Sequence, residues 1–145
     1  MSTIASTGPA VNADTVAAAL LSGDGTYSVT GQAYRGDGIV VAVDGAGCVV
    51  VPDGFTSAQL SGIVSAWVEH LAAPYVAAHP APFYRPHYVG SWVDSASGWV
   101  YLDVVEIFAR EDLDDAIDAG YDRNQIAIWD AGRQEEIATG GTGAV

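Results

Sequence analysis

Hydrophobic residues between positions 57 and 72 recur at steps of three and four, the spacing of one face of an α-helix. The apolar stripe consists of Leu60, Ile63, Val64, Trp67, Val68 and Leu71. Thr56 and Gln59 have the spacing of a capping box, and Pro74 lies just beyond the stripe. The pattern predicts a long amphipathic helix over residues 56–73, with its stripe packed against a sheet that contains residues 39–43 and 48–51.

A shorter, acidic helix is predicted over residues 111–120. Its inward positions are small or apolar, namely Leu113, Ala116, Ile117 and Gly120. Its outward positions are almost all carboxylates, namely Asp112, Asp114, Asp115 and Asp118. Early acidic residues complement the helix dipole, whereas like charges at three- and four-residue spacing cost a few tenths of a kcal/mol per pair. Such a face serves solubility, or it binds a basic partner.

β-Strands are predicted where apolar or alternating runs are bounded by turn residues. These runs are residues 27–30, 39–43, 48–51, 88–93, 99–104 and 125–130. The turns at 44–47 and 94–98 predict that 48–51 returns beside 39–43 and that 99–104 returns beside 88–93. A short helix ending at Leu21 is predicted after the capping residues at 12–14. Together these elements predict an α+β fold with a mixed or antiparallel sheet.

The chain has the length of one domain. We expect residues 1–11 to form an N-terminal arm, residues 12–138 a single α+β domain, and the glycine-rich residues 139–145 a flexible tail. Residues 74–86 hold four of the six prolines, and residues 78–86 are predicted to be an extended connector. A division into two subdomains would fall near residues 74–87, although each half is small for independent folding.

Composition and charge narrow the range of functions. Half of the 145 residues are hydrophobic, so a packed core is expected. The formal net charge of −13 repels phosphate backbones, so we expect no direct binding of nucleic acid. No run approaches the ~18 apolar residues of a spanning helix, and no basic region precedes apolar residues at the N-terminus. We expect a soluble protein of the cytoplasm, or one assembled there. The sequence predicts no oligomeric state.

Residues suited to metal binding or thiol chemistry are few and widely spaced. His79 and His87 would have to combine with Asp94 to hold a metal ion, because no closely spaced ligand pair is present. Cys48 is the only cysteine and begins a valine-rich strand, where a thiol behaves as a small core hydrophobe. We therefore expect no metal, no cofactor and no cysteine nucleophile.

Hydrolytic chemistry based on serine or on paired carboxylates is also disfavoured. The sequence contains no Gly-x-Ser-x-Gly motif. Asp103 and Glu106, with Asp94 across the turn, are the candidate carboxylate pair of a glycosidase. Acidic residues at strand ends are more often simply solvated. We therefore expect no enzyme activity.

Aromatic residues gather around the hairpin predicted at 88–104. Cross-strand aromatic pairs stabilise a hairpin, and exposed Tyr and Trp are also frequent binding anchors. Both interpretations stay open at this point. The candidate partner-binding residues are Tyr84, Arg85, Trp92, Trp99 and Tyr101 near the hairpin, and Asp112, Asp115 and Asp118 on the acidic helix.

Four short phrases carry a resemblance to a known group of proteins. They are Tyr-Val-Gly-Ser-Trp-Val-Asp at 88–94, Gly-Trp-Val-Tyr-Leu-Asp-Val-Val at 98–105, Arg-Asn-Gln-Ile-Ala-Ile-Trp-Asp at 123–130 and Thr-Gly-Gly at 139–141. Residues 88–141 resemble small uncharacterised domains of actinobacterial and actinobacteriophage proteins, some attached to larger phage polypeptides. The resemblance implies a phage or prophage origin and no particular activity; it does not extend to residues 1–80.

Three functional hypotheses follow. The first is a non-enzymatic, phage-related interaction protein, associated with the virion or bound to a larger phage or host protein. The second is an acidic inhibitor whose aspartates mimic nucleic acid and occupy a host nucleic-acid-binding protein. The third is a small hydrolase that uses His79, His87 and neighbouring carboxylates. We expect the first.

Overall fold

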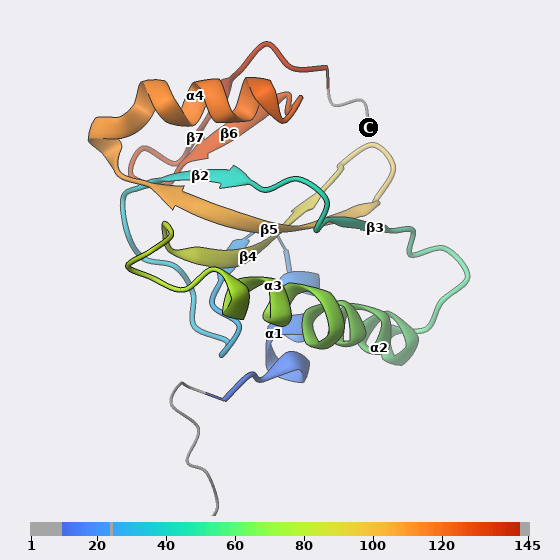
Figure 1. Ribbon diagram of the computed structural model, residues 1–145. Helices are drawn as coiled ribbons and strands as arrows, with labels where there is room; N and C mark the ends of the chain where they lie inside the picture. Colours follow the sequence, from blue (N-terminus) through green and yellow to red (C-terminus); the bar gives the residue numbers. More distant parts are fainter. Residues whose placement is uncertain (1–9, 24, 143–145) are drawn as a thin grey trace, which may run out of the picture.

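The computed structural model describes residues 10–23 and 25–142, which form an α+β fold built on one antiparallel sheet. The strands lie in the order β1-β4-β5-β2-β6-β7, and β3 also pairs with β5 (Figure 1). The helices are α1 (Ala13–Leu21), α2 (Ser57–Trp67), α3 (Ala73–Ala78) and α4 (Leu113–Asp122), with a π-helical turn Val68–Ala72 and a 3-10 turn Arg110–Asp112. The strands are β1 (Gly25–Tyr27), β2 (Ile39–Ala42), β3 (Cys48–Val50), β4 (His87–Val93), β5 (Val100–Phe108), β6 (Ala127–Asp130) and β7 (Glu135–Ala138).

The β4–β5 hairpin forms the centre of the sheet and confirms the pairing predicted for residues 88–93 and 99–104. Val93 lies opposite Val100, and the register continues without a bulge to His87 opposite Glu106. The Asp94 carboxylate accepts hydrogen bonds from the backbone of Ala96 and the hydroxyl of Ser97, which closes the turn between the strands. Strand β1 extends the sheet beside β4 but shares only Tyr27 with the predicted 27–30 strand. Residues 28–30 are not part of a strand, so that prediction is wrong for them.

Strands β2 and β3 do not pair with each other, so the hairpin predicted around the turn 44–47 is wrong. Strand β2 pairs with Val105–Phe108 and β3 with Val100–Leu102, both antiparallel to β5. The two strands therefore run in the same direction along β5 as one interrupted strand, and residues 44–47 loop out between them. Glycine-rich turns favour a reversal, but the long β5 offers hydrogen-bonding partners to both segments.

The long helix confirms the predicted start and extends beyond the predicted end. Thr56 and Gln59 form the expected capping box, with hydrogen bonds of 3.1 and 2.8 Å. The helix continues through Pro74 to Ala78 rather than ending at residue 73. Proline removes one backbone donor and crowds the carbonyl four residues earlier. The π-helical turn immediately before α3 alters the hydrogen bonding there, which allows the helix to pass the proline.

The buried stripe of this helix is narrower than predicted. Val64, Trp67 and Val68 are buried, whereas Ile63 and Leu71 are each 37% exposed. The prediction that Ile63 and Leu71 are buried is therefore wrong, because the contact with α1 and the sheet covers only the side of the helix that carries the other three residues.

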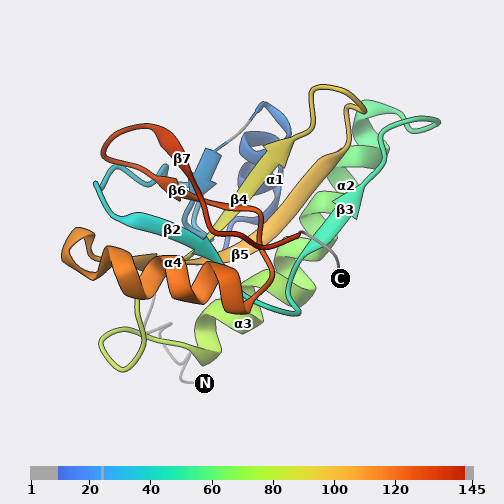
Figure 2. The same ribbon diagram turned by 90° about the horizontal axis from the view of Figure 1, so that it is seen from above.

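All the described helices pack on the same face of the sheet. Val89, Leu102 and Val104 lie against α1 and α2, whereas Ile39 and Phe108 lie against α4. The strand register pairs Val89 with Val104 and Ile39 with Phe108, and alternate residues of β5 share a face. The helices occupy different regions of that face, α1–α3 near β4 and β5 and α4 near β2, β6 and β7 (Figure 1). Figure 2 shows the β4–β5 hairpin extending away from α4.

The C-terminal part adds a strand that the sequence pattern did not reveal. Strand β7 pairs with β6 from Ala127 opposite Ala138 to Asp130 opposite Glu135. Residues 139–142, predicted to be flexible, are held: Thr139 is buried, and the backbone of Thr142 donates to the Asn124 side chain at 2.8 Å. The rest of the predicted tail, 143–145, and residues 1–9 of the predicted arm lie outside the described residues.

Candidate functional site

The face of the sheet opposite the helices is concave. We call this surface the concave face. The hollow that it encloses has a volume of about 1280 Å³. Side chains that alternate with the core residues line it, since successive strand residues point to opposite sides. Its lining comes from both edge strands and from every strand between them, and includes Thr26, Tyr34, Ala42, Val49, Trp92, Asp103, Trp129 and Glu136. This volume is larger than the roughly 300–1,000 Å³ of typical small-molecule pockets.

One end of the concave face is filled by the chain itself. The Tyr34 ring packs edge-on against Tyr88, with 5.0 Å between ring centroids. Both pack on a small apolar cluster of Val40, Val105 and Ile107. The segment that carries Tyr34 therefore covers this end.

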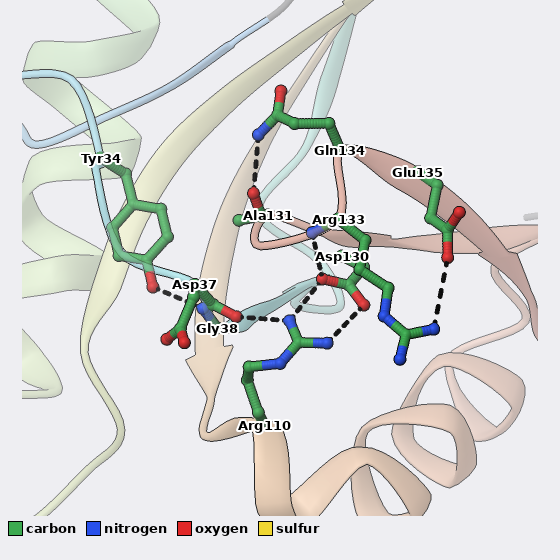
Figure 3. Close-up of polar contacts among 9 residues, drawn as sticks. All are labelled: Tyr34, Asp37, Gly38, Arg110, Asp130, Ala131, Arg133, Gln134 and Glu135. Atoms are coloured by element: carbon green, nitrogen blue, oxygen red, sulfur yellow. Dashed lines mark hydrogen bonds and ion pairs between the residues drawn. The ribbon is translucent and has the colours of Figure 1, made fainter.

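An ion pair fixes the segment before β2 to the end of β6 (Figure 3). The Arg110 guanidinium contacts both oxygens of Asp130, at 2.5 and 2.9 Å, and donates to the carbonyl of Asp37 at 2.7 Å. Asp130 also accepts from the backbone of Arg133 at 3.0 Å. The hydrogen bonds from Arg110 lower the pKa of Asp130 to about 2.

Replacing Asp130 with asparagine should lower the melting temperature at pH 7. A depressed folded-state pKa stabilises the fold above the usual pKa of about 3.8, and this stabilisation is lost as the pH falls towards 2. Thermal unfolding of Asp130→Asn and the unsubstituted protein should therefore differ at pH 7 and converge between pH 4 and 2. Glu135→Gln is the matched control, because the Arg133–Glu135 pair is 3.9 Å apart and mostly exposed. A constant difference at every pH would contradict the assignment.

The other end of the concave face is open and aromatic. Trp92 and Tyr101 lie opposite each other on β4 and β5, with 5.1 Å between ring centroids. Val49 lies opposite Tyr101 on its other side. Trp92 is 48% exposed and Val49 is 49% exposed, while Trp99, one residue before β5, is 40% exposed. The predicted binding residues Trp92, Trp99 and Tyr101 are thus brought together on one part of the sheet.

Asp103 lies next to this aromatic pair. It faces Gly90 across the β4–β5 ladder, two residues along from the Tyr101–Trp92 pair, and points to the same side of the sheet. Burial raises the pKa of Asp103 to about 6. Within residues 10–23 and 25–142 no donor or cation contacts its carboxylate. The concave face therefore holds a partly buried carboxylate without a counter-ion.

The other predicted aromatic and basic residues lie elsewhere. Tyr84 and Arg85 are in the exposed segment before β4, at the end of the strand opposite Trp92. Tyr84 packs edge-on against His79 at 4.7 Å, and the Arg85 guanidinium lies 3.8 Å above the Phe108 ring. Neither residue lines the concave face, so the predicted binding set does not form one surface.

The acidic helix has the predicted orientation. Asp115 and Asp118 are exposed, Asp112 is partly buried, and Ala116 and Gly120 face the core. Helix α4 packs on the face opposite the concave face. The carboxylates of α4 and the aromatic residues of the hairpin are therefore two separate candidate surfaces.

The structure brings the two loop histidines together without a third ligand. His79 and His87 have ring centroids 5.3 Å apart, and each Nδ1 bonds a nearby backbone carbonyl. Asp94 lies at the far end of β4, so the metal site that would combine it with these histidines is not formed. The described residues contain no group of three or more His, Cys, Asp or Glu positioned to share a metal ion.

The candidate carboxylate pair is not assembled either. Asp103 and Glu106 are an odd number of residues apart on β5, and therefore lie on opposite faces. Glu106 is buried and forms an ion pair with Arg123. Burial, and then the nearby Asp103 carboxylate, raises the pKa of Cys48, which opposes formation of a thiolate.

The residues that sequence reasoning missed are Asp103 as an unpaired carboxylate and Gly90 opposite it. Strand alternation places both beside Trp92 on one face, so the pattern Gly90-Ser91-Trp92 with Tyr101-Leu102-Asp103 contained the signal. The missing counter-ion could not be inferred, because the arginines that neutralise other acids come from distant parts of the chain.

Comparison of the chain with models of known protein families, with curated proteins and with solved structures finds no significant match. None of the helices within residues 10–23 and 25–142 is both long enough and apolar enough to cross a membrane.

Proposed function

We propose that this protein is a non-enzymatic interaction protein that binds a segment of a larger protein in the concave face. The main support for this proposal is that no helix covers this face of the sheet. Trp92 and Tyr101 lie there beside the exposed Val49. Large aromatic side chains are the commonest anchors of protein interfaces. Their exposure is not needed for the core, which is complete on the other face of the sheet.

The shape of the surface favours a protein segment over a small ligand. The concave face extends from β1 to β7, and its volume of about 1280 Å³ is lined by both apolar and polar side chains. Small-molecule sites enclose most of the ligand surface in a narrower cavity. A segment of polypeptide can cover a broad surface and place alternate side chains in separate contacts.

The resemblance of residues 88–141 to phage-related domains leads us to place the partner in a phage or its host, with the virion as one location. The net charge of −13 disfavours direct binding of nucleic acid. The second candidate, an acidic inhibitor of a nucleic-acid-binding protein, is favoured by the exposed Asp114, Asp115 and Asp118 on α4. The two proposals place the partner on opposite faces of the sheet.

Site-specific photo-crosslinking in native cells distinguishes the two surfaces. A photoreactive benzoylphenylalanine is introduced in separate variants at Val49 on the concave face, at Asp118 on α4, and at Phe83 as the control. Phe83 is 87% exposed and lies outside the concave face, so it reports non-specific contacts. We expect a discrete protein adduct from position 49, absent from positions 83 and 118.

An adduct from position 118 alone would replace our proposal with the inhibitor model. The absence of any adduct specific to position 49 would overturn the proposal. Trp92→Ala in the background of the position-49 variant should reduce the adduct strongly, because it removes the aromatic anchor while leaving the photoreactive group in place.

A further inference from the structure

The open end of the concave face combines a carboxylate with two aromatic rings. Asp103 and Tyr101 are two residues apart on β5 and point to the same side, about 7 Å apart. Trp92 lies diagonally across from Asp103, within reach of a long side chain. The residue directly opposite Asp103 is Gly90, which places no side chain beside it on β4. On its other side the Asp103 Oδ1 atom lies next to Gly47, where a Cβ would come within 2.7 Å of it.

We propose that Asp103, Trp92 and Tyr101 form a site for one cationic side chain, an arginine or a lysine, of the protein segment that occupies the concave face. This inference rests on the proposed function and adds the chemistry of the partner. A cation between a carboxylate and the face of a Trp or Tyr ring gains both a charge-assisted hydrogen bond and a cation–π contact. Arginine suits such a site well, because its planar guanidinium stacks on rings and pairs with carboxylates.

The arginines of the chain leave Asp103 without a partner, so a cation that pairs with it has to come from another molecule. The sequence has five basic residues, all arginines, against eighteen acidic ones. Arg110 and Arg123 form ion pairs with Asp130 and Glu106. Of the other three, Arg85 lies over the Phe108 ring, Arg133 is near Glu135, and Arg35 is exposed. None of the five contacts Asp103.

The remaining charged groups of the concave face do not replace this cation. Arg35 and Arg123 line the surface, as do the acidic residues Asp44 and Glu136. Arg123 is engaged with Glu106 and with the carbonyl of Ala42, at 2.9 Å from the latter. The two additional carboxylates add to the negative potential of the surface, which favours the approach of a basic segment.

The test is an NMR titration of the ¹⁵N-labelled protein with Nα-acetyl-arginine amide. We expect weak saturable binding, on the order of a millimolar, that shifts the Trp92 indole N–H and the amides around Gly90 and Asp103. Nα-acetyl-citrulline amide has nearly the same shape without the charge, and it should bind at least about tenfold more weakly. Equal shifts from arginine and citrulline would overturn the proposal.

Two variants and one control locate the site. Asp103→Asn removes the charge and should abolish the arginine shifts. Trp92→Ala removes one of the two rings and should strongly weaken the arginine-induced shifts of the Gly90 and Asp103 amides. Asp118→Asn, which removes an exposed charge on α4, should leave them unchanged. Retained binding in Asp103→Asn, or binding lost in Asp118→Asn, would reject the site.

The same variants separate this inference from the proposed function. If Asp103→Asn leaves the crosslinked adduct from position 49 intact and arginine does not bind, the protein-binding surface stands and the cation site is wrong. If arginine binds as expected and no adduct forms at position 49, the cation site stands and its assignment to a protein partner is wrong.

Discussion

Replacing Trp67 with alanine should lower the free energy of unfolding by about 3–5 kcal/mol. Trp67 is only 7% exposed and packs in the core formed by α1, α2 and the sheet. Its indole N–H donates to the carbonyl of Ala46 at 3.1 Å. The substitution therefore leaves a cavity and an acceptor without its partner in the loop between β2 and β3. Urea unfolding followed by far-UV circular dichroism measures the change.

Ile63→Ala is the matched control on the same helix. Ile63 is 37% exposed and faces away from the core, and alanine has the higher helix propensity. Its free energy of unfolding should change by less than about 1 kcal/mol. Equal effects of the two substitutions would show that the helix does not present Trp67 to the core. In that case the two faces of the helix would have to be reassigned.

Features set by local sequence were predictable. The capping box at Thr56 and the β4–β5 hairpin depend on residues close together in the chain, and both form as expected. The partner of β3 was not predictable in this way. Strands β2 and β3 compete for hydrogen bonds with each other and with β5, and only the complete sheet decides that β5 pairs with both.

The course of the long helix past Pro74 illustrates a second limit. Proline terminates most helices, so the pattern predicted an end at residue 73. The buried Ala72 and Ala73 and the half-buried Tyr75 and Val76 continue the contact with the core. This burial stabilises the helical conformation beyond Pro74, and the π-helical turn before it accommodates the proline. Tertiary packing thus outweighs the local signal.

The candidate site was predictable in its aromatic part only. Trp92 and Tyr101 were identified because alternation places them on one face of the hairpin. Asp103 was grouped instead with Glu106, which alternation places on the opposite face of β5. Whether an acidic residue has a counter-ion depends on distant segments. Glu106 has Arg123 and Asp130 has Arg110, whereas no arginine reaches Asp103.

We expect a buried carboxylate without a counter-ion to destabilise the fold at neutral pH, which makes Asp103 a candidate functional residue. Binding residues are often retained although their replacement would stabilise the protein. Asp103 has no role in the hydrogen bonding of the fold that would explain a buried carboxylate here, since that carboxylate has no donor within the described part of the chain. Its effect on stability can be measured without knowing the partner.

Asp103→Asn should raise the free energy of unfolding at pH 7.5 by about 2–3 kcal/mol. The folded-state pKa of Asp103 is raised to about 6 from a usual value of 3.8, because burial disfavours the charged form. A difference of roughly two pKa units corresponds to about 3 kcal/mol, and partial exposure reduces it. Asparagine has nearly the same shape and carries no charge. Urea unfolding at pH 7.5 and at pH 3.5 measures the effect.

The dependence on pH identifies the cause. A raised folded-state pKa gives the protonated carboxyl group a stabilising contribution below the unfolded pKa of about 3.8, and this contribution is lost as the pH rises through 6. The gain from Asp103→Asn should therefore be full above pH 6, shrink between pH 6 and 4, and vanish at pH 3.5. Asp118→Asn, at an exposed position on α4, should show no such window. A gain of equal size at both pH values would point to packing instead of charge, and a loss of stability at pH 7.5 would mean that the Asp103 carboxylate is satisfied within the fold. Either outcome would remove the argument that this carboxylate awaits a cation from a partner.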